Sequence, residues 1–483
     1  MTVNSKWFSF ASALLLLMAF EPANAWALLF VGLAPILYRL GEPNVRPFRC
    51  GYGFGLIYGL GQLLWIAQLV ERWTKSPILA ILVLVLATSL FAIYFGIAGW
   101  LIQRCWRFNL PWLIPFCWCG IEVFRSYIPV FAFPWGLLAS PLWHAPVLMH
   151  PARFGTIFGV GSLIALANTS FAVLLRDKNL RRFGPMLALC VTVFAATFCV
   201  QYFVPRGVIT RVSSGQPGVD LAFGDPKTSD LAVDFNVQRT QQQARRDHTQ
   251  LLVLPEGLVH TGPKLPPDLP FEISSGIPIV FGGLRGNKPA YQSAFGYDGQ
   301  WSVINKTRLV IFGEFVPGRN WIPFLDQFHL PSGDISAGER VQALQLGNLT
   351  VGPLICFEAL FPDIAYRQAM NGSQVLAVMS MDDWFANTNA PDQLRAASVW
   401  RSVETGKPLV RAATTGYSFI TDGTGTIVGQ SPLSVQTTLT RDIQVRAPDR
   451  PWWLPVFPIL CFAFTAWFTA ASTVQLKRST TQK

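Results

Sequence analysis

Val351-Gly352-Pro353-Leu354-Ile355-Cys356-Phe357-Glu358 is an apolar run that ends in a cysteine, with a carboxylate two residues further on. An apolar run of this length followed by a break is typical of a buried strand that delivers a residue to the edge of a sheet. Two other apolar runs end in the same way, because 251–255 precedes Glu256 and 301–305 precedes Lys306. A thiol, a carboxylate and an ammonium at three strand ends form a nucleophilic site. In such a site the carboxylate takes the thiol proton and the ammonium stabilises an oxyanion.

Each of these residues has a simpler interpretation when it is taken alone. A cysteine after a strand is more often an inert buried thiol, and a lone glutamate or lysine is usually a turn or solvated residue. The combination in this order favours catalysis, and Cys356 is the only cysteine between residues 206 and 450. The other seven cysteines lie in or beside apolar segments without a CxxC pair, so we expect neither a disulfide framework nor a zinc site.

The composition is that of a membrane protein. Hydrophobic residues make up 51% of the 483 residues and charged residues only 13%, against roughly 25% charged in typical soluble domains. The net charge of +11 does not indicate nucleic-acid binding, because the basic residues gather between apolar segments, where they report topology.

Eight apolar segments approach the length of about 20 residues that a helix needs to cross a bilayer. They are 7–20, 26–40, 52–70, 77–102, 110–127, 154–175, 184–204 and 453–474, of which the first is short. An alternative for the first is a cleaved signal peptide ending at Ala23-Asn24-Ala25. Lysine and arginine are more frequent in the segments that share a side with both termini, which predicts cytoplasmic termini and an outer 206–450 region. We therefore expect a membrane domain at 1–205 with seven helices, an outer domain at 206–450, and a last helix with a cytoplasmic tail at 451–483.

The outer region alternates between strand-like and helix-like segments. Strand-like runs lie at 251–254, 278–282, 302–304, 351–355 and 375–379, and helix-like stretches at 234–248 and 391–405. This alternation predicts α/β layers.

Several motifs together resemble the Glu-Lys-Cys signature of the nitrilase superfamily. They are Leu254-Pro255-Glu256, Asn305-Lys306, the Phe-Gly-Glu-Phe-Val-Pro segment at 312–317 and the Ile-Cys-Phe-Glu-Ala-Leu-Phe-Pro segment at 355–362. The membrane-bound apolipoprotein N-acyltransferase branch is the most similar, and the resemblance covers nearly the whole chain. It implies an αββα sandwich for the outer domain, next to a membrane domain of about eight transmembrane helices in all.

The resemblance also implies roles for individual residues. Glu256 is the base, Lys306 and backbone amides near Phe357 stabilise the oxyanion, and Cys356 is the nucleophile. The remaining implied residues support these or contact substrate: Glu314 and Glu358 as supporting carboxylates, Trp384 and Phe385 as a lid, and Trp135 in the substrate-facing Phe133-Pro134-Trp135-Gly136 loop. The simpler alternatives are capping or pairing for the two carboxylates and an interfacial aromatic belt for Trp135.

The implied reaction transfers an acyl chain from a phospholipid, through a cysteine thioester, to the N-terminal amino group of a diacylated apolipoprotein. It takes place at the bacterial inner membrane on the periplasmic side, with no metal, no organic cofactor and no nucleic acid. Two alternatives stay open: a membrane-tethered amidase or nitrilase that uses the same triad, and a non-catalytic lipoprotein-binding descendant. A transporter is disfavoured because Glu122 is the one notable acidic residue within the expected spans.

The chain also departs from the family pattern. Met381 replaces Asn, Phe357 replaces Tyr, Leu394 stands where His is common, and Ile311 replaces Pro. The end of the first outer strand, expected near 221–225, lacks the usual Gln-Gly-Asn segment and the Trp that follows it. These changes leave the triad in place and bear on which acceptor is used.

Overall fold

The computed structural model describes residues 5–178, 180–200, 207–273, 276–319, 321, 334–385 and 388–481. The chain divides into two compact units. One comprises Met1–Phe203, Thr388–Ala390 and Trp453–Lys483, and the other comprises Val204–Asn387 and Pro391–Trp452. The boundary expected between residues 205 and 206 lies outside the described residues.

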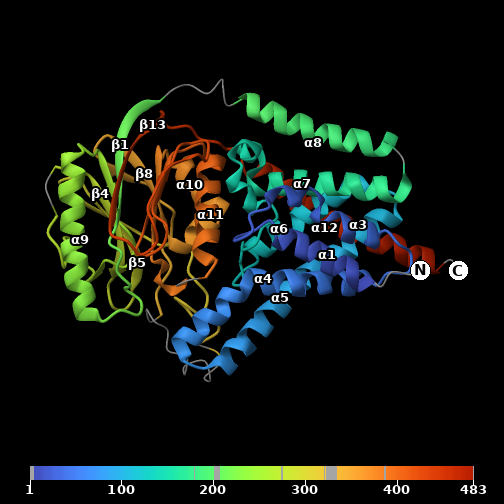
Figure 1. Ribbon diagram of the computed structural model, residues 1–483, viewed down its shortest axis with the longest axis horizontal. Helices are drawn as coiled ribbons and strands as arrows, with labels where there is room; N and C mark the ends of the chain where they lie inside the picture. The colour runs from blue at the N-terminus through green and yellow to red at the C-terminus, as the bar shows by residue number, and fades with distance from the viewer. Residues whose placement is uncertain are drawn as a thin grey trace. The chain divides into compact units, whose positions relative to one another are not determined.

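The first unit is helical (Figure 1). Its helices are α1 (Ser5–Leu17), α2 (Leu29–Gly32), α3 (Ala34–Leu40), α4 (Pro47–Thr74), α5 (Pro77–Arg107), α6 (Ile114–Tyr127), α7 (Ala152–Asp177), α8 (Leu180–Val200) and α12 (Val456–Thr481). Each of the eight predicted apolar segments therefore contains a helix within its described residues. Within the described ranges, five helices are long and apolar enough to cross a membrane: α4, α5, α7, α8 and α12. The remaining segments are shorter, since a helix of 14 residues such as α6 extends about 21 Å against a hydrocarbon core of about 30 Å.

Local sequence explains where the longest pair of helices ends. Pro47 opens α4 in its first turn, and Lys75 closes it in the left-handed conformation. Ser76 then caps α5, because its hydroxyl accepts a hydrogen bond from the Leu79 backbone N–H at 3.3 Å. The cap and the left-handed residue stand side by side, so the chain reverses between α4 and α5 within two residues.

The second unit contains two β-sheets. The first has the order β13-β1-β2-β4-β5-β6, with β3 paired to β4, and the second has the order β12-β11-β10-β9-β8-β7. The first sheet consists of β1 (Val208–Gln216), β2 (Leu251–Val253), β3 (Val259–Thr261), β4 (Ile279–Arg285), β5 (Tyr291–Tyr297), β6 (Trp301–Asn305) and β13 (Thr437–Val445). The second consists of β7 (Leu344–Leu346), β8 (Leu349–Ile355), β9 (Val375–Ser380), β10 (Leu409–Ala413), β11 (Phe419–Thr421) and β12 (Ile427–Gln430).

Alternating side chains place the first sheet between two apolar layers. Leu251 and Val253 of β2 join Val351 and Val375 of the second sheet in one buried core, whereas Leu252 packs with residues of α9 (Pro226–Arg246) in another. The alternation follows from the two-residue period of a strand. Helices α10 (Pro362–Met370) and α11 (Ala390–Thr405) lie on the side of the second sheet, and α9 lies on the side of the first (Figure 1). The predicted αββα sandwich is confirmed.

Two predicted boundaries were wrong. Strand β1 ends at Gln216, well before 221–225, where the chain instead forms a turn held by Asp220, whose carboxylate accepts from the backbone N–H of Phe223 at 2.9 Å. Helix α9 begins at Pro226 rather than at residue 234. Asp225 caps it by accepting from the Thr228 N–H at 3.1 Å, and proline at the first helical position favours this start.

Candidate active site

Strand direction brings the polar strand ends of each sheet to one edge. Strands β2 and β4 are parallel, and β6 runs the same way because β4–β5 and β5–β6 are both antiparallel. Glu256 and Lys306 therefore follow strands whose carboxyl ends share an edge of the first sheet. In the second sheet, β8, β9 and β10 are parallel, and Cys356 directly follows β8.

Glu256, Lys306 and Glu314 form a buried charged cluster. The Lys306 ammonium lies 2.6 Å from Glu314 Oε1 and 3.5 Å from Glu256 Oε1. Lys306 is 1% exposed and Glu256 is 4% exposed, and charges this deep require partners. Glu314 is itself fixed, because its Oε2 accepts from the Val310 N–H at 2.9 Å.

The Glu256 carboxylate is held by two further donors. The Gln292 side-chain amide donates to Oε1 at 2.8 Å, and the Met381 N–H donates to Oε2 at 3.2 Å. The neighbouring strand must be glycine at 282, because a Cβ there would lie 2.8 Å from Glu256 Cα. The arrangement leaves the carboxylate little freedom, which suits a base with a fixed target.

Cys356 occupies a strained turn between β8 and the 3₁₀ helix η7 (Cys356–Leu360). Its φ is +49°, in the left-handed region that costs an L-residue roughly 1–2 kcal/mol. Such strain gathers at functional sites, where the surrounding structure maintains it.

The charges and the burial of the cluster favour a protonated Cys356 thiol next to a Glu256 carboxyl whose pKa is raised. Burial, assisted by the Glu256 charge, raises the pKa of Cys356 to about 12, and Lys306 opposes that rise. Burial also raises the pKa of Glu256, against the lowering effect of Lys306. Burial lowers the pKa of Lys306, but Glu256 and Glu314 outweigh it, so the net direction is upward. A thiol with this pKa would react through a general base, and the raised pKa of Glu256 suits that task while Lys306 stays charged.

Glu358 joins the two sheets at the site. Its Oε1 accepts from the Thr307 N–H at 2.7 Å and from the Arg308 N–H at 3.2 Å, directly after Lys306. Its Oε2 accepts from the Ile355 N–H at 3.0 Å, directly before Cys356. This carboxylate therefore links the residue before Cys356 to the residues after Lys306, and burial raises its pKa despite these hydrogen bonds.

The predicted aromatic residues lie in different places. Trp384 belongs to the 3₁₀ helix η8 (Asp382–Phe385), together with Phe385, and its ring meets Phe223 edge-on with centroids 5.6 Å apart. Phe357 makes a similar contact with Phe361 at 5.3 Å. The segment that was predicted to be a lid thus begins directly after Met381, whose backbone N–H donates to Glu256.

Trp135 belongs to the helical unit and is 2% exposed. Its indole N–H donates to the Gln62 carbonyl at 3.1 Å, and its own carbonyl accepts from Arg125 at 2.6 Å. Arg125 pairs with Glu122 at 3.8 Å, so the E-x-x-R pair holds the aromatic loop. Its role toward substrate stays a prediction.

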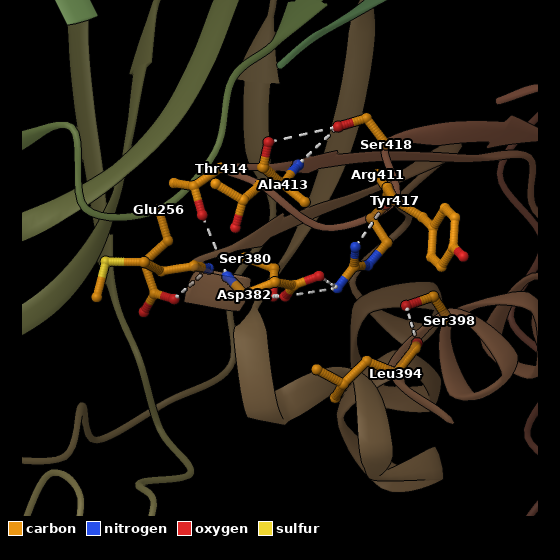
Figure 2. A network of polar contacts seen from close by, with 12 residues as sticks. Glu256, Ser380, Asp382, Leu394, Ser398, Arg411, Ala413, Thr414, Tyr417 and Ser418 are labelled. Atoms are coloured by element: carbon orange, nitrogen blue, oxygen red, sulfur yellow. Dashed lines mark hydrogen bonds and ion pairs between the residues drawn. The ribbon is translucent and has the colours of Figure 1, made fainter. Parts of the chain in front are cut away.

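Sequence reasoning missed a buried polar network beside the site (Figure 2). Asp382 is ion-paired with Arg411 at 2.9 Å and accepts from the Ser380 hydroxyl at 2.6 Å. Gly416 is required beside this pair, because a Cβ there would lie 1.8 Å from Asp382 Oδ2. In the part of the chain that the structure describes, no group of three or more His, Cys, Asp or Glu side chains is placed to hold a metal ion.

Two family models match separate parts of the chain. Residues 12–170 match the apolipoprotein N-acyltransferase N-terminal domain, and residues 287–447 match carbon-nitrogen hydrolase. The two matches fall on the helical unit and on the sandwich, respectively.

Curated relatives extend over most of the chain. The apolipoprotein N-acyltransferase of Geobacter metallireducens is 29% identical over 464 residues, which cover 90% of this chain and 88% of the relative. That of Ralstonia nicotianae is 28% identical over 468 residues, which cover 88% and 85%. Among solved structures, a mutant of the Nesterenkonia AN1 amidase from the nitrilase superfamily is 20% identical with a TM-score of 0.35, covering 52% of this chain and 95% of that chain.

Proposed function

The chain belongs to the apolipoprotein N-acyltransferase family, and we propose that it transfers an acyl chain from a phospholipid to a lipoprotein N-terminus through a thioester on Cys356. The observation that carries this proposal is the buried Glu256–Lys306–Glu314 cluster next to the strained turn at Cys356. That arrangement pairs a base with a nucleophile and places a fixed positive charge beside them.

In the first step Glu256 takes the Cys356 proton and the sulfur attacks the carbonyl carbon of a phospholipid ester. The developing oxyanion is stabilised by the Lys306 ammonium, which Glu314 holds at 2.6 Å. The C–O ester bond then breaks, and the leaving alkoxide of the lysophospholipid takes the proton that Glu256 holds. Cys356 is left as a thioester, and Glu256 is a carboxylate again.

In the second step the α-amino group of a diacylglyceryl-cysteine attacks the thioester carbonyl. Glu256 accepts the amine proton, the C–S bond breaks, and the thiolate of Cys356 recovers a proton from Glu256. The products are an amide and the starting enzyme. A thioester suits this exchange because it is reactive toward amines.

The helical unit fits this chemistry, since donor and acceptor are both anchored in lipid. The chain is a membrane protein by its apolar helices and its relatives. We place it in the bacterial inner membrane, with a membrane domain at 1–205, a periplasmic catalytic domain at 206–450 and a C-terminal helix and tail at 451–483. Trp384, Phe385 and Trp135 are proposed to contact the acyl chains, and Phe357 to contribute a backbone N–H to the oxyanion.

The test is intact-mass analysis of the purified full chain incubated with phospholipid and no acceptor. We expect an acyl adduct that hydroxylamine removes, absent from Cys356→Ser and retained in the matched control Cys199→Ser, whose thiol is exposed on α8. Addition of a diacylated lipopeptide should convert the adduct to an N-acyl amide.

Two results would overturn the proposal. An adduct that persists in Cys356→Ser would place the chemistry on another residue. Release of free fatty acid without amide, in the presence of the lipopeptide, would favour the membrane-tethered amidase, in which water resolves the thioester.

A further inference from the structure

Ser380 lies beside Cys356 at the carboxyl edge of the second sheet. Strands β8 and β9 are parallel, with Ile355 opposite Met379. The residues that follow this pair are Cys356 after β8 and Ser380 at the end of β9. Neighbouring strands are about 4.8 Å apart, which places the Ser380 hydroxyl within reach of the cysteine side chain. Ser380 is fully buried, so water does not compete for its hydroxyl.

The Ser380 hydroxyl is oriented by a buried ion pair (Figure 2). It donates to Asp382 Oδ1 at 2.6 Å. Asp382 in turn accepts from Arg411 Nη2 at 3.0 Å and 2.9 Å through its two oxygens. The other terminal guanidinium nitrogen of Arg411, Nη1, donates to the Tyr417 carbonyl at 2.6 Å. Because a carboxylate only accepts, the serine hydrogen points to Asp382 and the oxygen lone pairs are left for the thiol.

We propose that Ser380 is a catalytic hydrogen-bond partner of the Cys356 sulfur, and that Asp382 and Arg411 are positioning residues that hold its hydroxyl. In the resting enzyme Ser380 accepts from the S–H and donates to Asp382. When Glu256 takes the thiol proton, the Ser380 hydroxyl rotates and donates to the thiolate, while Arg411 keeps Asp382 paired. No proton leaves Ser380, and the inference rests on the proposed role of Cys356 as nucleophile.

The charges around the thiol explain why this hydrogen bond matters. Glu256 faces the thiol from the end of β2, Lys306 from the end of β6 with Glu314 behind it, and Asp382 from the segment after β9. Burial, Glu256 and Asp382 raise the pKa of Cys356, whereas Lys306 and the Ser380 hydrogen bond lower it. Ser380 is thus a neutral group whose hydrogen bond stabilises the buried thiolate without adding charge.

The test is the rate of iodoacetamide alkylation of Cys356 between pH 7 and 10, followed by mass spectrometry of its peptide in the full chain. A hydrogen bond to a charged group, once lost, should raise the pKa of the thiol by about one unit. At a given pH, the thiolate fraction of Cys356 in Ser380→Ala is then about a tenth of that in the wild type. The more basic thiolate is roughly threefold more nucleophilic, so the net rate should fall about threefold at each pH. Ser380→Thr keeps a hydroxyl and should restore the wild-type rate.

The matched control is Ser398→Ala, which removes a buried hydroxyl that donates to the Leu394 carbonyl in α11 (Figure 2). Its alkylation should equal that of the wild type. Alkylation of Ser380→Ala at the wild-type rate would overturn the inference, as would equal slowing in Ser398→Ala. These outcomes are separate from acyl transfer: a wild type without an acyl adduct, but with the Ser380→Ala effect, would refute the proposed function and leave this hydrogen bond standing.

Discussion

Glu358 Oε1 accepts a hydrogen bond from the backbone N–H of Thr307 at 2.7 Å, which ties the turn that carries Cys356 to the residue after Lys306. The same oxygen accepts from the Thr307 hydroxyl at 2.8 Å, and Oε2 accepts from the Ile355 N–H. Cys356 follows a strand of one sheet and Lys306 a strand of the other, and this carboxylate links the two segments. Glu358 thus caps η7 through the Ile355 N–H and also links it to the segment after Lys306, so we expect it to act as a positioning residue.

Glu358→Gln should damage both stability and chemistry. An amide NH₂ in place of one oxygen faces backbone donors and leaves at least one of them unsatisfied, at a cost of about 1–3 kcal/mol. We expect a lower Tm and a slower single-turnover formation of the acyl adduct. Glu339→Gln, at an exposed glutamate, is the control. A Glu358→Gln protein with wild-type Tm and rate would show that the hydrogen bonds of Glu358 do not position Cys356.

Glu314→Gln should shift the pH profile of thioester formation to lower pH. Glu256 must be ionised to take the thiol proton, so the rate falls as pH drops through the pKa of Glu256. Burial and then the charge of Glu314 raise that pKa, opposed by Lys306, so removal of the Glu314 charge lowers it. The plateau rate should also drop, because Lys306 loses the charged partner at 2.6 Å. An acid limb that stays in place, or moves upward, would contradict this account.

The strand-end positions of Glu256, Lys306 and Cys356 could be predicted from the sequence because each residue directly follows an apolar run, a signal confined to a few neighbouring residues. A common strand direction brings such ends to one edge within each sheet, and the packing of the two sheets then brings Cys356 to the other two residues. The supporting groups have no comparable local signal. Gln292 lies inside β5, and Asp382 meets Arg411 only because β9 and β10 pair in one register, although 29 residues separate them.

The helical unit shows a similar limit. Hydropathy found all eight segments, but helix length depends on local breaks that a hydropathy average does not detect. Helix α1 ends at Leu17, before Glu21-Pro22, and α3 ends at Leu40, before Glu42-Pro43. The residue before a proline disfavours the helical conformation, so these two segments stay short. Among the described residues, the sequence therefore predicted the positions of the apolar helices better than their lengths.

Asp382→Asn should destabilise the sandwich strongly. The change leaves Arg411, 1% exposed, with no charged partner for its guanidinium at this position. Breaking a buried ion pair from one side costs about 3–5 kcal/mol. Asp442→Asn, which breaks the exposed pair with Arg211, is the control and should change Tm little. Equal Tm values for the two variants would show that the buried pair is not needed for folding.

Trp384→Ala should impair substrate use more than folding. The ring contacts Phe223 edge-on and lies three residues after Met381, whose N–H binds Glu256. Loss of one aromatic contact costs about 0.5–1.5 kcal/mol beyond the buried area, whereas loss of an acyl-chain contact should raise KM for phospholipid. Phe271→Ala, in the core under α9, is the comparison, since it should lower Tm without changing KM of the folded fraction. Unchanged KM in Trp384→Ala would assign Trp384 to packing alone.

The side of the membrane that carries the catalytic unit depends on how many helices cross it. If all eight helical segments cross from a cytoplasmic N-terminus, seven precede residue 207, so the sandwich is outside and the C-terminus is inside. If only the five long helices cross, four precede residue 207, so the sandwich is inside and the C-terminus is outside.

Reporter fusions after Gln216 and at the C-terminus distinguish these cases, because alkaline phosphatase is active outside and a fluorescent protein inside. We expect phosphatase activity only at Gln216 and fluorescence only at the C-terminus, since the excess of lysine and arginine favours cytoplasmic termini. The reverse pattern would contradict this topology and place the chemistry on the cytoplasmic side, as it would be if the short helices α1, α2–α3 and α6 did not span the bilayer.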